Sequence, residues 1–475
     1  FDRWFSRDKT FQTPFEFYKY DRILDKYNKT KSGGGINLYE GRAEDQRLTY
    51  QASLMYDNSF LDQHNVSALF VLEESSYKYN VLSAARVNFI SPEIEEIFAG
   101  PTLDLTNGGS SSETVRRGYV GRLNYNYEGK YLFQFNFRYD GSFNFPAGKR
   151  WGFFPAVSGG WRLSEERFMK NNKIFHNLKL RASYGEFGND RISAYQFLSG
   201  YTPGSGAVIG GNFQSGITDT SIANPNVTWE TARNTDVGID FSILGGKISS
   251  ELTYFHKKTV DILTTRAASV PTSFGAILPP ENLGETSNRG IEAIVRYEDK
   301  VGDFGYSIEG NVTWAKSKIL FIDEASDVKE WQRRTGRPFD QFLGYKAMGF
   351  FQSQEEINNW AIQDGNNNSR LKVGDIKYDD YDKNGVIDGR DKVFVGKSQI
   401  PEVIFGLNLA ASYKQFDLAM SFQGATGFDQ YMTWDPFNLE SNALAIFKDS
   451  WSEDNPNAKY PRLYAGTYQN NREDS

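Results

Sequence analysis

The stretch "YLFQFNFRYD", from Tyr131 to Asp140, decides the fold class of this chain. Phe133, Phe135 and Phe137 share one face of an extended backbone, and polar residues alternate with them on the other face. A repeat of two is typical of a β-strand, whereas an α-helix repeats about every 3.6 residues. We therefore predict a strand with one apolar and one polar face.

The same alternation returns along the chain. It is found in "LKLRASY" (178–184), "DVGIDFSI" (236–243), "GYSIEGNVTW" (305–314) and "VIFGLNLAASY" (403–413). We count about a dozen such strands, many of them near the ~10 residues that a membrane-spanning strand needs. Alternation alone does not distinguish a barrel in lipid from a soluble sandwich or propeller.

The connections between these strands favour the barrel. Tight links occur at "YEGK" (127–130), "LGGK" (244–247) and "YKQF" (413–416). They interleave with long connections at 188–232, 259–289 and 317–402. Outer-membrane barrels have this order, with short periplasmic turns and long extracellular loops. The sequence thus predicts an all-β protein, a transmembrane antiparallel β-barrel, whose long loop region 317–402 is extracellular.

Composition excludes several other classes of protein. The 475 residues carry a net charge of −7 and no cysteine. The negative charge gives no support for nucleic-acid binding, and the lack of cysteine excludes a thiolate zinc site and a cysteine nucleophile. No apolar run approaches the ~18 residues of a transmembrane helix, but a barrel needs none because only every second residue faces lipid.

Covalent chemistry is not predicted. The adjacent glutamates 165–166 and 355–356 are far more often solvated turns than catalytic pairs, and no serine lies in a G-x-S-x-G elbow. We expect no enzyme. A sheet in lipid cannot leave an edge strand, because unpaired N–H and C=O groups find no water there. About a dozen strands do not obviously close a barrel of this kind, so we expect an incomplete barrel with strands missing.

Five motifs follow one another between about Tyr119 and Gly427. They are "YDGSFNFPAGKRWGFFPAVSGGWRLSEE", "SYGEFGN", "NPNVTWETARNTDVGIDFSILGGKISSELTYFHKKTVDIL", "NLGETSNRGIEA" and the block that runs from "GYKAMGFFQSQEEI" to "SFQGATG". In this order they resemble the SusC/RagA type of TonB-dependent outer-membrane transporter found in the Bacteroidetes. The resemblance covers roughly two-thirds of the chain.

The resemblance implies a barrel of about 22 strands around a plug domain. It also implies import of oligosaccharides or peptides, energised by the TonB–ExbB–ExbD complex and covered by a SusD-like surface lipoprotein. No part of the chain matches the plug, the N-terminal extension, the TonB box or the final strands of the family. Two alternatives stay open: a siderophore or cobalamin receptor without a lid, and a soluble calcium-stabilised β protein that binds carbohydrate.

The stretch "DDYDKNGVIDGRD" (379–391) resembles the calcium loop D-x-[DN]-x-[DN]-G-x₅-E. Gly385 supplies the sharp turn, and the loop runs from 380 to 391. The predicted ligands are Asp380, Asp382, Asn384, the carbonyl of Val386, Asp388 and Asp391. Extended flanks, "GDIKY" and "KVFVG", predict an EF-like loop on a β scaffold with a structural calcium ion. The simpler alternative is a solvated acidic turn.

Tryptophans in the expected outer loops are weak candidates for substrate binding. They are Trp331, Trp360, Trp434 and Trp451. Aromatic faces can stack on sugar rings, but packing within the loops or the aromatic girdle at the membrane interface accounts for them equally simply.

Overall fold

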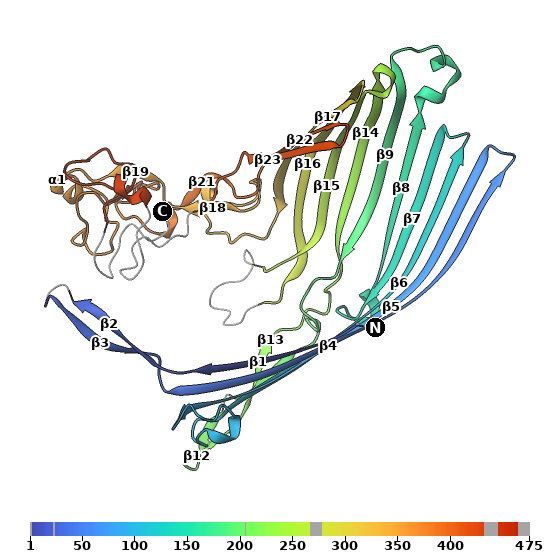
Figure 1. Ribbon diagram of the computed structural model, residues 1–475. Coiled ribbons are helices and arrows are strands. Elements are labelled where there is room, and N and C mark those ends of the chain that lie inside the picture. Colours follow the sequence, from blue (N-terminus) through green and yellow to red (C-terminus); the bar gives the residue numbers. More distant parts are fainter. Residues whose placement is uncertain (1, 22–23, 205, 267–277, 432–444, 464–475) are drawn as a thin grey trace.

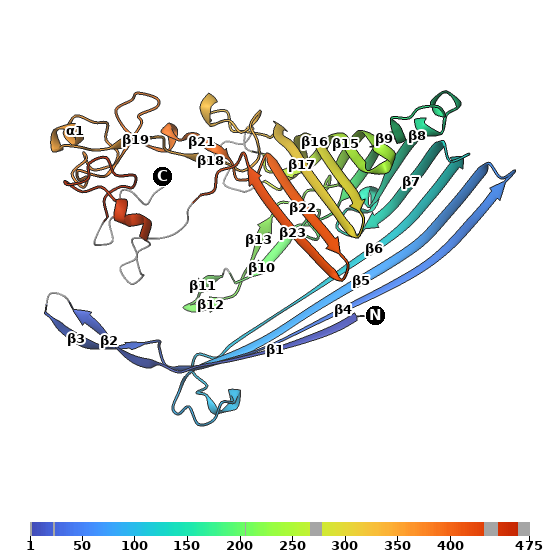
Figure 2. The ribbon, with the colours of Figure 1, turned by 45° about the horizontal axis from the view of Figure 1, so that its top comes forward.

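The computed structural model describes residues 2–21, 24–204, 206–266, 278–431 and 445–463. Among them, thirteen strands form one antiparallel sheet, curved into part of a barrel wall (Figures 1 and 2). These strands are β1 (Asp2–Gln12), β4 (Ile36–Phe60), β5 (His64–Phe89), β6 (Thr106–Tyr127), β7 (Tyr131–Ser142), β8 (Trp151–Arg162), β9 (Phe175–Asn189), β14 (Glu230–Ile243), β15 (Ile248–Thr264), β16 (Glu281–Val301), β17 (Phe304–Phe321), β22 (Val403–Tyr413) and β23 (Phe416–Thr426). Each strand pairs with its neighbours in this order, which confirms the predicted all-β antiparallel class.

Shorter elements lie in the connections. The strands are β2 (Phe15–Asp21), β3 (Lys26–Ser32), β10 (Gly200–Pro203), β11 (Ala207–Ile209), β12 (Asn212–Gln214), β13 (Ile217–Ser221), β18 (Gln341–Gly344), β19 (Ala347–Phe350), β20 (Ile376–Tyr378) and β21 (Val393–Ser398). The helices are α1 (Gln354–Asn358) and the 3₁₀ turns η1 (Ile97–Ala99), η2 (Ala147–Lys149), η3 (Leu163–Glu165), η4 (Arg167–Met169), η5 (Leu244–Gly246), η7 (Glu330–Gln332), η8 (Gly389–Asp391) and η9 (Ala445–Asp449). Among the described residues, none of these helices has the length and apolar character needed to cross a membrane.

The predicted strands are present, but several run further than the sequence indicated. β22 coincides with the predicted 403–413, and the three tight links join successive strands at one end of the sheet. The predicted connection 259–289 is wrong in extent, because β15 continues to Thr264 and β16 begins at Glu281. Pairing between neighbouring strands continues there after the apolar alternation has ended, since backbone hydrogen bonds do not require an apolar face.

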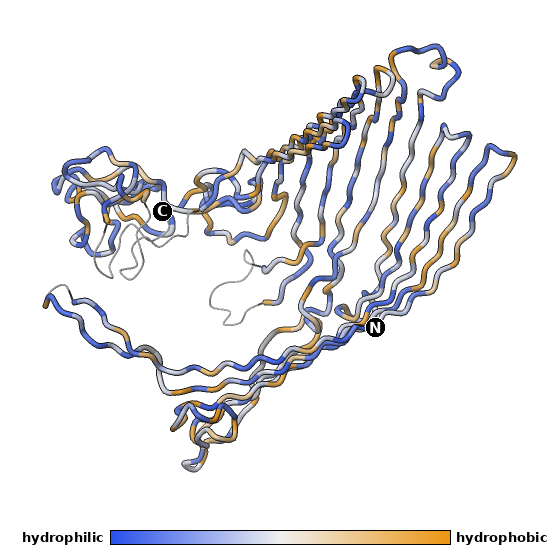
Figure 3. The backbone as a smooth tube through the Cα atoms, in the orientation of Figure 1, coloured by the Kyte–Doolittle hydropathy of each residue, from blue (hydrophilic) through white to orange (hydrophobic). Residues whose placement is uncertain are grey.

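Two rows of aromatic side chains mark the height of the membrane on the outer face of the wall. Tyr119, Tyr139 and Trp151 form one stacked row. Tyr127, Tyr131 and Trp161 form the other. Between Trp151 and Trp161 lie about ten residues, or ~33 Å of strand and ~25 Å of height at a tilt near 40°, which matches the apolar band of such barrels. The alternation of apolar and polar residues in this band is visible along the strands in Figure 3.

The wall rises well beyond the outer row of aromatic residues. β4, β5 and β6 have 25, 26 and 22 residues, and β6 continues from Tyr119 back to Thr106. That overhang is about 13 residues, or ~43 Å of strand. Cross-strand ion pairs replace the apolar face there, for example Arg117–Glu74 and Lys78–Glu113. These strands therefore continue into water beyond the apolar band.

The connection from β17 to β22 folds into a small unit with its own core. Phe351, Ile357 and Leu371 are buried in one cluster, and Ile376, Tyr378 and Ile387 in a second one. Within this connection, the two-stranded ribbon of β18 and β21 lies between the two buried clusters and the barrel wall (Figures 1 and 2).

The segment 445–463, which follows β23, packs onto this unit. The Arg462 N–H donates to the Gly374 carbonyl at 3.0 Å, and the Trp451 indole donates to Gln352 at 3.3 Å. Gly374 has φ +91°, and a Cβ there would overlap the ring of Trp451. Two segments far apart in the sequence are thus joined into one body, which we call the loop unit (322–402 with 445–463).

Candidate metal site and the inner face of the wall

The loop 380–391 lies between two strands, as the sequence predicted. β20 ends just before it, η8 forms its last turn, and β21 follows. Ile387 is buried, and its N–H donates to the Ile362 carbonyl at 2.8 Å. The Ile362 N–H in turn donates to the Gly385 carbonyl at 2.9 Å. The extended flanks are confirmed, and a neighbouring chain segment braces the middle of the loop.

Three carboxylates of the loop converge on one point. One oxygen each of Asp380, Asp382 and Asp391 lies within 4.8 Å of the others. Asp391 is only 1% exposed, while the other two are half-buried. Like charges held this close repel one another, and burial makes the repulsion harder to screen. Such an arrangement is stable where a cation neutralises it.

Backbone N–H groups hold these carboxylates in place. Asp380 accepts from Gly385 at 2.8 Å and from Asn384 at 3.1 Å. Asp391 accepts from the N–H groups of Asp382 at 3.1 Å and Asp388 at 2.8 Å. Gly385 has φ +85°, in the left-handed region that glycine adopts without strain. The chain therefore wraps around the point where the carboxylates meet.

The other predicted ligands have partners of their own. Asn384 Oδ1 accepts from the Val386 N–H at 2.7 Å. Asp388 forms an ion pair with Arg390 at 2.7 Å. Its carboxylate also caps η8 by accepting from the backbone N–H of Arg390. The Arg390 side chain, and then its N–H, lowers the pKa of Asp388. The structure thus brings together three of the predicted side chains and directs Asp388 toward a guanidinium.

The donor chemistry of the loop fits calcium. Carboxylate, amide and carbonyl oxygens are hard ligands, and no nitrogen or sulfur ligand belongs to the predicted set. Asp391 is shorter than the glutamate usual at the last position. Even so, both of its oxygens lie inside the loop, where backbone donors fix them. The residues present would hold a divalent cation by charge and by loop closure.

A second Asx-rich turn follows the segment that braces the loop. Asp364 accepts from the N–H groups of Asn366 at 2.7 Å, Asn368 at 2.8 Å and Arg370 at 2.9 Å. Burial alone would raise the pKa of Asp364, but the three N–H donors outweigh it and lower this pKa. Asn368 extends the turn by donating to the Ile357 carbonyl at 3.1 Å.

Three of the four predicted tryptophans are held within the loop unit. Trp331 donates to the Arg390 carbonyl at 3.0 Å, at the exit of the loop 380–391. The Trp360 indole donates to Tyr378 at 2.9 Å inside the buried cluster. Trp451 covers Gly374. Trp434 lies outside the described residues. The stacking of sugar rings on these side chains stays a prediction.

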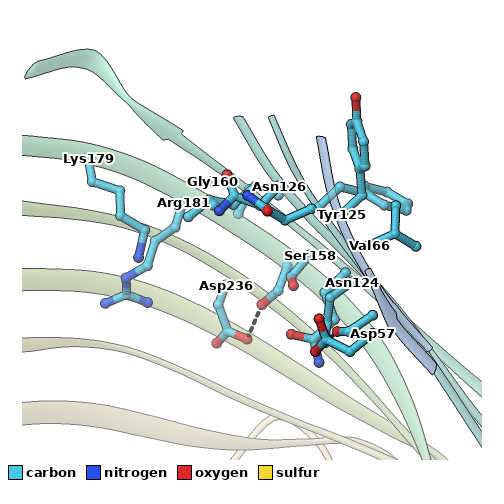
Figure 4. Close-up of a pocket in the computed structure, with 18 residues that line it drawn as sticks. Asp57, Val66, Asn124, Tyr125, Asn126, Ser158, Gly160, Lys179, Arg181 and Asp236 are labelled. Atoms are coloured by element: carbon cyan, nitrogen blue, oxygen red, sulfur yellow. Dashed lines mark hydrogen bonds between the residues drawn. The ribbon is translucent and has the colours of Figure 1, made fainter. Parts of the chain in front are cut away.

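The inner face of the wall has a polar hollow of about 470 Å³ (Figure 4). Seven of its residues lie in register across adjacent strands: Asp57, Ser67, Asn124, Gln134, Ser158, Ser183 and Asp236. Arg181 and Lys179 lie on one side of the hollow and Asp57 on the other. The small side chains of this row leave space that the longer ones around it enclose.

The charges beside the hollow are paired. Arg181 donates to Asp240 at 2.9 Å and to Thr253 at 2.6 Å, and Lys179 donates to Asp240 at 3.3 Å. Gly238 makes room, because a Cβ there would lie 2.7 Å from the Arg181 guanidinium carbon. The hollow was not predicted. Gln134, Ser183 and Asp236 belong to predicted polar faces, but only the register across the strands aligns them with the rest of the row.

An antiparallel wall that is apolar outside, polar inside and bordered by two aromatic rows defines an outer-membrane β-barrel. The family described as "TonB dependent receptor-like, beta-barrel" matches residues 2–434, and the chain belongs to this family. This is a receptor and transporter family rather than a class of enzymes.

Named relatives agree with this assignment. A TonB-dependent receptor of Formosa agariphila is 31% identical over 97% of this chain and 48% of its own length. The TonB-dependent receptor SusC of Bacteroides thetaiotaomicron is 28% identical over 68% of this chain and 32% of its own length. The chain therefore spans about half the length, or less, of these curated relatives.

Solved structures share the fold. The RagAB peptide importer in its "open-open" state gives a TM-score of 0.76 at 19% identity, over 98% of this chain and 49% of that one. A second RagAB structure gives 0.73, also at 19% identity, over 91% of this chain and 47% of that one. The resemblance to the SusC/RagA type and the outer-membrane location are confirmed. The soluble alternative is thereby set aside.

Proposed function

We propose that the complete protein imports oligosaccharides or peptides across the outer membrane, driven by the TonB–ExbB–ExbD complex. The observation that carries this proposal is the row of hydroxyl, amide and carboxylate groups in register along the inner wall. Five of the seven side chains are neutral hydrogen-bonding groups, and these suit polar, uncharged cargo, which exchanges bonds to water for bonds to the wall at small net cost. The similarity to a TonB-dependent receptor, SusC, and to a peptide importer, RagAB, supports the same proposal.

We further propose that a SusD-like surface lipoprotein covers the extracellular mouth. The loop unit supports this partner, because it is a folded body with a buried core rather than a set of loose loops. A surface with fixed geometry loses little conformational freedom when it binds a partner. The loop unit would then act as a platform against which a lid closes.

The test is affinity purification of the full-length protein in detergent from its native membrane, followed by mass spectrometry and uptake assays. Recovery of a stoichiometric lipoprotein, with TonB-dependent uptake of labelled oligosaccharide or peptide, is the expected result. A barrel recovered alone that takes up an iron chelate or a cobalamin would overturn the proposal in favour of a receptor without a lid.

We also propose a structural calcium ion in the loop 380–391. The converging carboxylates support it, with Asp391 buried among them. The ion would brace the loop unit and take no part in transport chemistry. Isothermal titration of the full-length, calcium-stripped protein should show one bound ion per chain in the range of ~10⁻⁴ to 10⁻³ M that suffices outside cells. A titration without heat of binding, at several temperatures, would reject it.

A further inference from the structure

The outer face of the wall carries a basic patch directly above the apolar band. On β14 to β17 the outward row at the top of the band consists of Val237, Tyr254, Ile291 and Trp314, in register and exposed by 40 to 55%. The next two outward rows hold eight positions. Thr235, His256, Arg289 and Lys316 form the lower row, and Arg233, Lys258, Ser287 and Lys318 form the upper row. Six of the eight are basic, two carry hydroxyl groups, and none is acidic.

Acidic groups occur only at the border of this patch, among the described residues. Glu186 pairs with Arg233 at 3.3 Å, Glu285 with Lys258 at 2.8 Å, and Glu402 with Lys316 at 3.8 Å. Within the described part of the chain, Arg289 and Lys318 form no ion pair and no side-chain hydrogen bond. The centre of the patch therefore keeps an excess of positive charge, although the chain as a whole is negative.

Two of these cations directly oppose one another. Arg289 of β16 is the register partner of Lys316 of β17, and His256 is its partner on the other side. Side chains at opposed positions have Cβ atoms ~5 Å apart, and like charges there destabilise a sheet. An anion bound between the two strands would convert this repulsion into attraction, as phosphate does with clustered lysines and arginines.

The position of the patch identifies the kind of anion. Its lower row follows immediately after Tyr254, Ile291 and Trp314, which face the acyl chains. Aromatic residues at this level lie among the lipid headgroups. A lipid that covers the apolar row places its own headgroup over the basic patch. A soluble anion would make no use of the row beneath.

We propose that this patch binds the phosphorylated headgroup of an outer-leaflet glycolipid of the lipid A type. Arg289 and Lys316 would hold the phosphate, with Lys318 and Arg233 beside them, and the row from Val237 to Trp314 would contact the acyl chains. The proposal depends on the outer-membrane location of the barrel and is independent of its cargo. It names a lipid site that fixes the orientation and height of the wall in the membrane.

The experiment measures binding of lipid A to the full-length protein in detergent micelles. Diphosphoryl lipid A is compared with the same lipid after removal of its phosphates. The double variant Arg289→Gln/Lys316→Gln should bind lipid A about 30-fold more weakly, since each basic residue near an anionic surface contributes roughly fivefold. Lys257→Gln is the matched control, because Lys257 lies between two patch residues of β15 but faces inward. It should leave the affinity unchanged.

Two further measurements keep the result decisive. Arg289→Lys/Lys316→Arg changes both side chains but keeps both charges, so it should bind lipid A about as tightly as the wild type; binding as weak as in the double Gln variant would show that the substitutions act through the fold and not through the charge. Rising salt should weaken lipid A binding by the wild type more steeply than binding by the double Gln variant, which keeps only the remaining basic residues of the patch. The proposal is overturned if phosphate removal changes nothing, if Lys257→Gln weakens binding as much, or if inorganic phosphate displaces lipid A at equal concentration.

Discussion

Replacing Asp391 with asparagine tests whether the loop 380–391 holds a cation. Asp391 is almost fully buried, and its oxygens accept from the N–H groups of Asp382 and Asp388. Asparagine has the same shape without the charge, and its amide nitrogen would face one of these two donors. The change therefore removes a cation ligand and part of the loop's hydrogen bonding at the same time.

The expected effect without calcium is small, because two contributions oppose one another. Carboxylate oxygens that lie within 4.8 Å of one another repel by at least about 3.5 kcal/mol per pair at an effective dielectric constant near 20. Asp391→Asn relieves two such pairs. Against this stands the loss of charge-assisted hydrogen bonds, each contributing about 1.5–3 kcal/mol. In the presence of a chelator, the loop 380–391 should therefore open with a similar free energy in the wild type and in Asp391→Asn.

Addition of calcium should make the free energy of loop opening differ between the wild type and Asp391→Asn. A site with a dissociation constant of ~10⁻⁴ to 10⁻³ M gains about 1.4–2.7 kcal/mol at about 10 mM calcium. Amide hydrogen exchange of the full-length protein, followed by mass spectrometry of peptides from the loop, reads this gain locally. In the wild type, exchange at Gly385 and Asp388 should slow about 10- to 100-fold on addition of calcium. In Asp391→Asn it should not change.

The matched control is Asp388→Asn. The carboxylate of Asp388 is directed to Arg390 and lies outside the converging group, so most of the calcium response should survive. The reasoning fails if Asp391→Asn responds to calcium as strongly as the wild type, or if the wild type itself gains no protection. Either result would identify the loop as an acidic turn held together by its backbone bonds alone.

Three more predictions concern packing and pH. Gly374→Ala should release the segment 445–463 from the loop unit, because φ +91° is strained for alanine and a Cβ would overlap Trp451; limited proteolysis should cut this segment faster. Gly188→Ala should destabilise the wall by about 1–3 kcal/mol, because a Cβ would overlap the buried ring of Phe154, and the folded band on a gel should be lost at lower temperature. The pKa of Asp364 lies below its ordinary 3.8, so its three accepted bonds stabilise the loop unit above that pH and are lost as the pH falls below it; amide exchange, corrected for the intrinsic effect of pH, should accelerate there.

Each of these three changes has a control. Gly365→Ala meets no atom within 4 Å at φ +65°, so it should show only the backbone part of the Gly374 effect and leave the segment 445–463 attached. Gly310→Ala meets open space on β17 and should leave the gel transition unchanged. Asp364→Asn should abolish the pH response. Equal effects in variant and control would contradict the packing argument in the first two cases, and a persisting pH response would contradict the third.

The membrane band could be predicted from the sequence because each strand there carries its own signal. Phe133, Phe135 and Phe137 alternate with polar residues in one unbroken run, and lipid on one side requires this pattern. The overhang of β4 to β6 gives no such signal, since both faces are in water. Its order comes from pairs such as Arg3–Glu44, 41 residues apart, which a local pattern cannot reveal.

The loop 380–391 was predictable because its ligands and its turn lie within one short stretch. Asp380 and Gly385 bond to one another across five residues. The direction of the Asp388 side chain was not predictable. Arg390 competes with a cation for its carboxylate, and the calcium-loop pattern does not specify the residue at that position. The polar hollow and the basic patch lay further out of reach. Both depend on register across several strands, and a shift of one residue in any strand would turn that strand's side chains to the opposite face of the wall.

The joining of two separate connections into one loop unit also bears on how such barrels diversify. Gly374 and Trp451 belong to different connections, and each makes sense only beside the other. A recombination event that exchanged the β17–β22 connection alone would remove Gly374, and Trp451 would lose the glycine against which its ring packs. Inheritance should therefore transfer the two connections together, as one cassette. In relatives whose mouths differ, these positions should change as a pair.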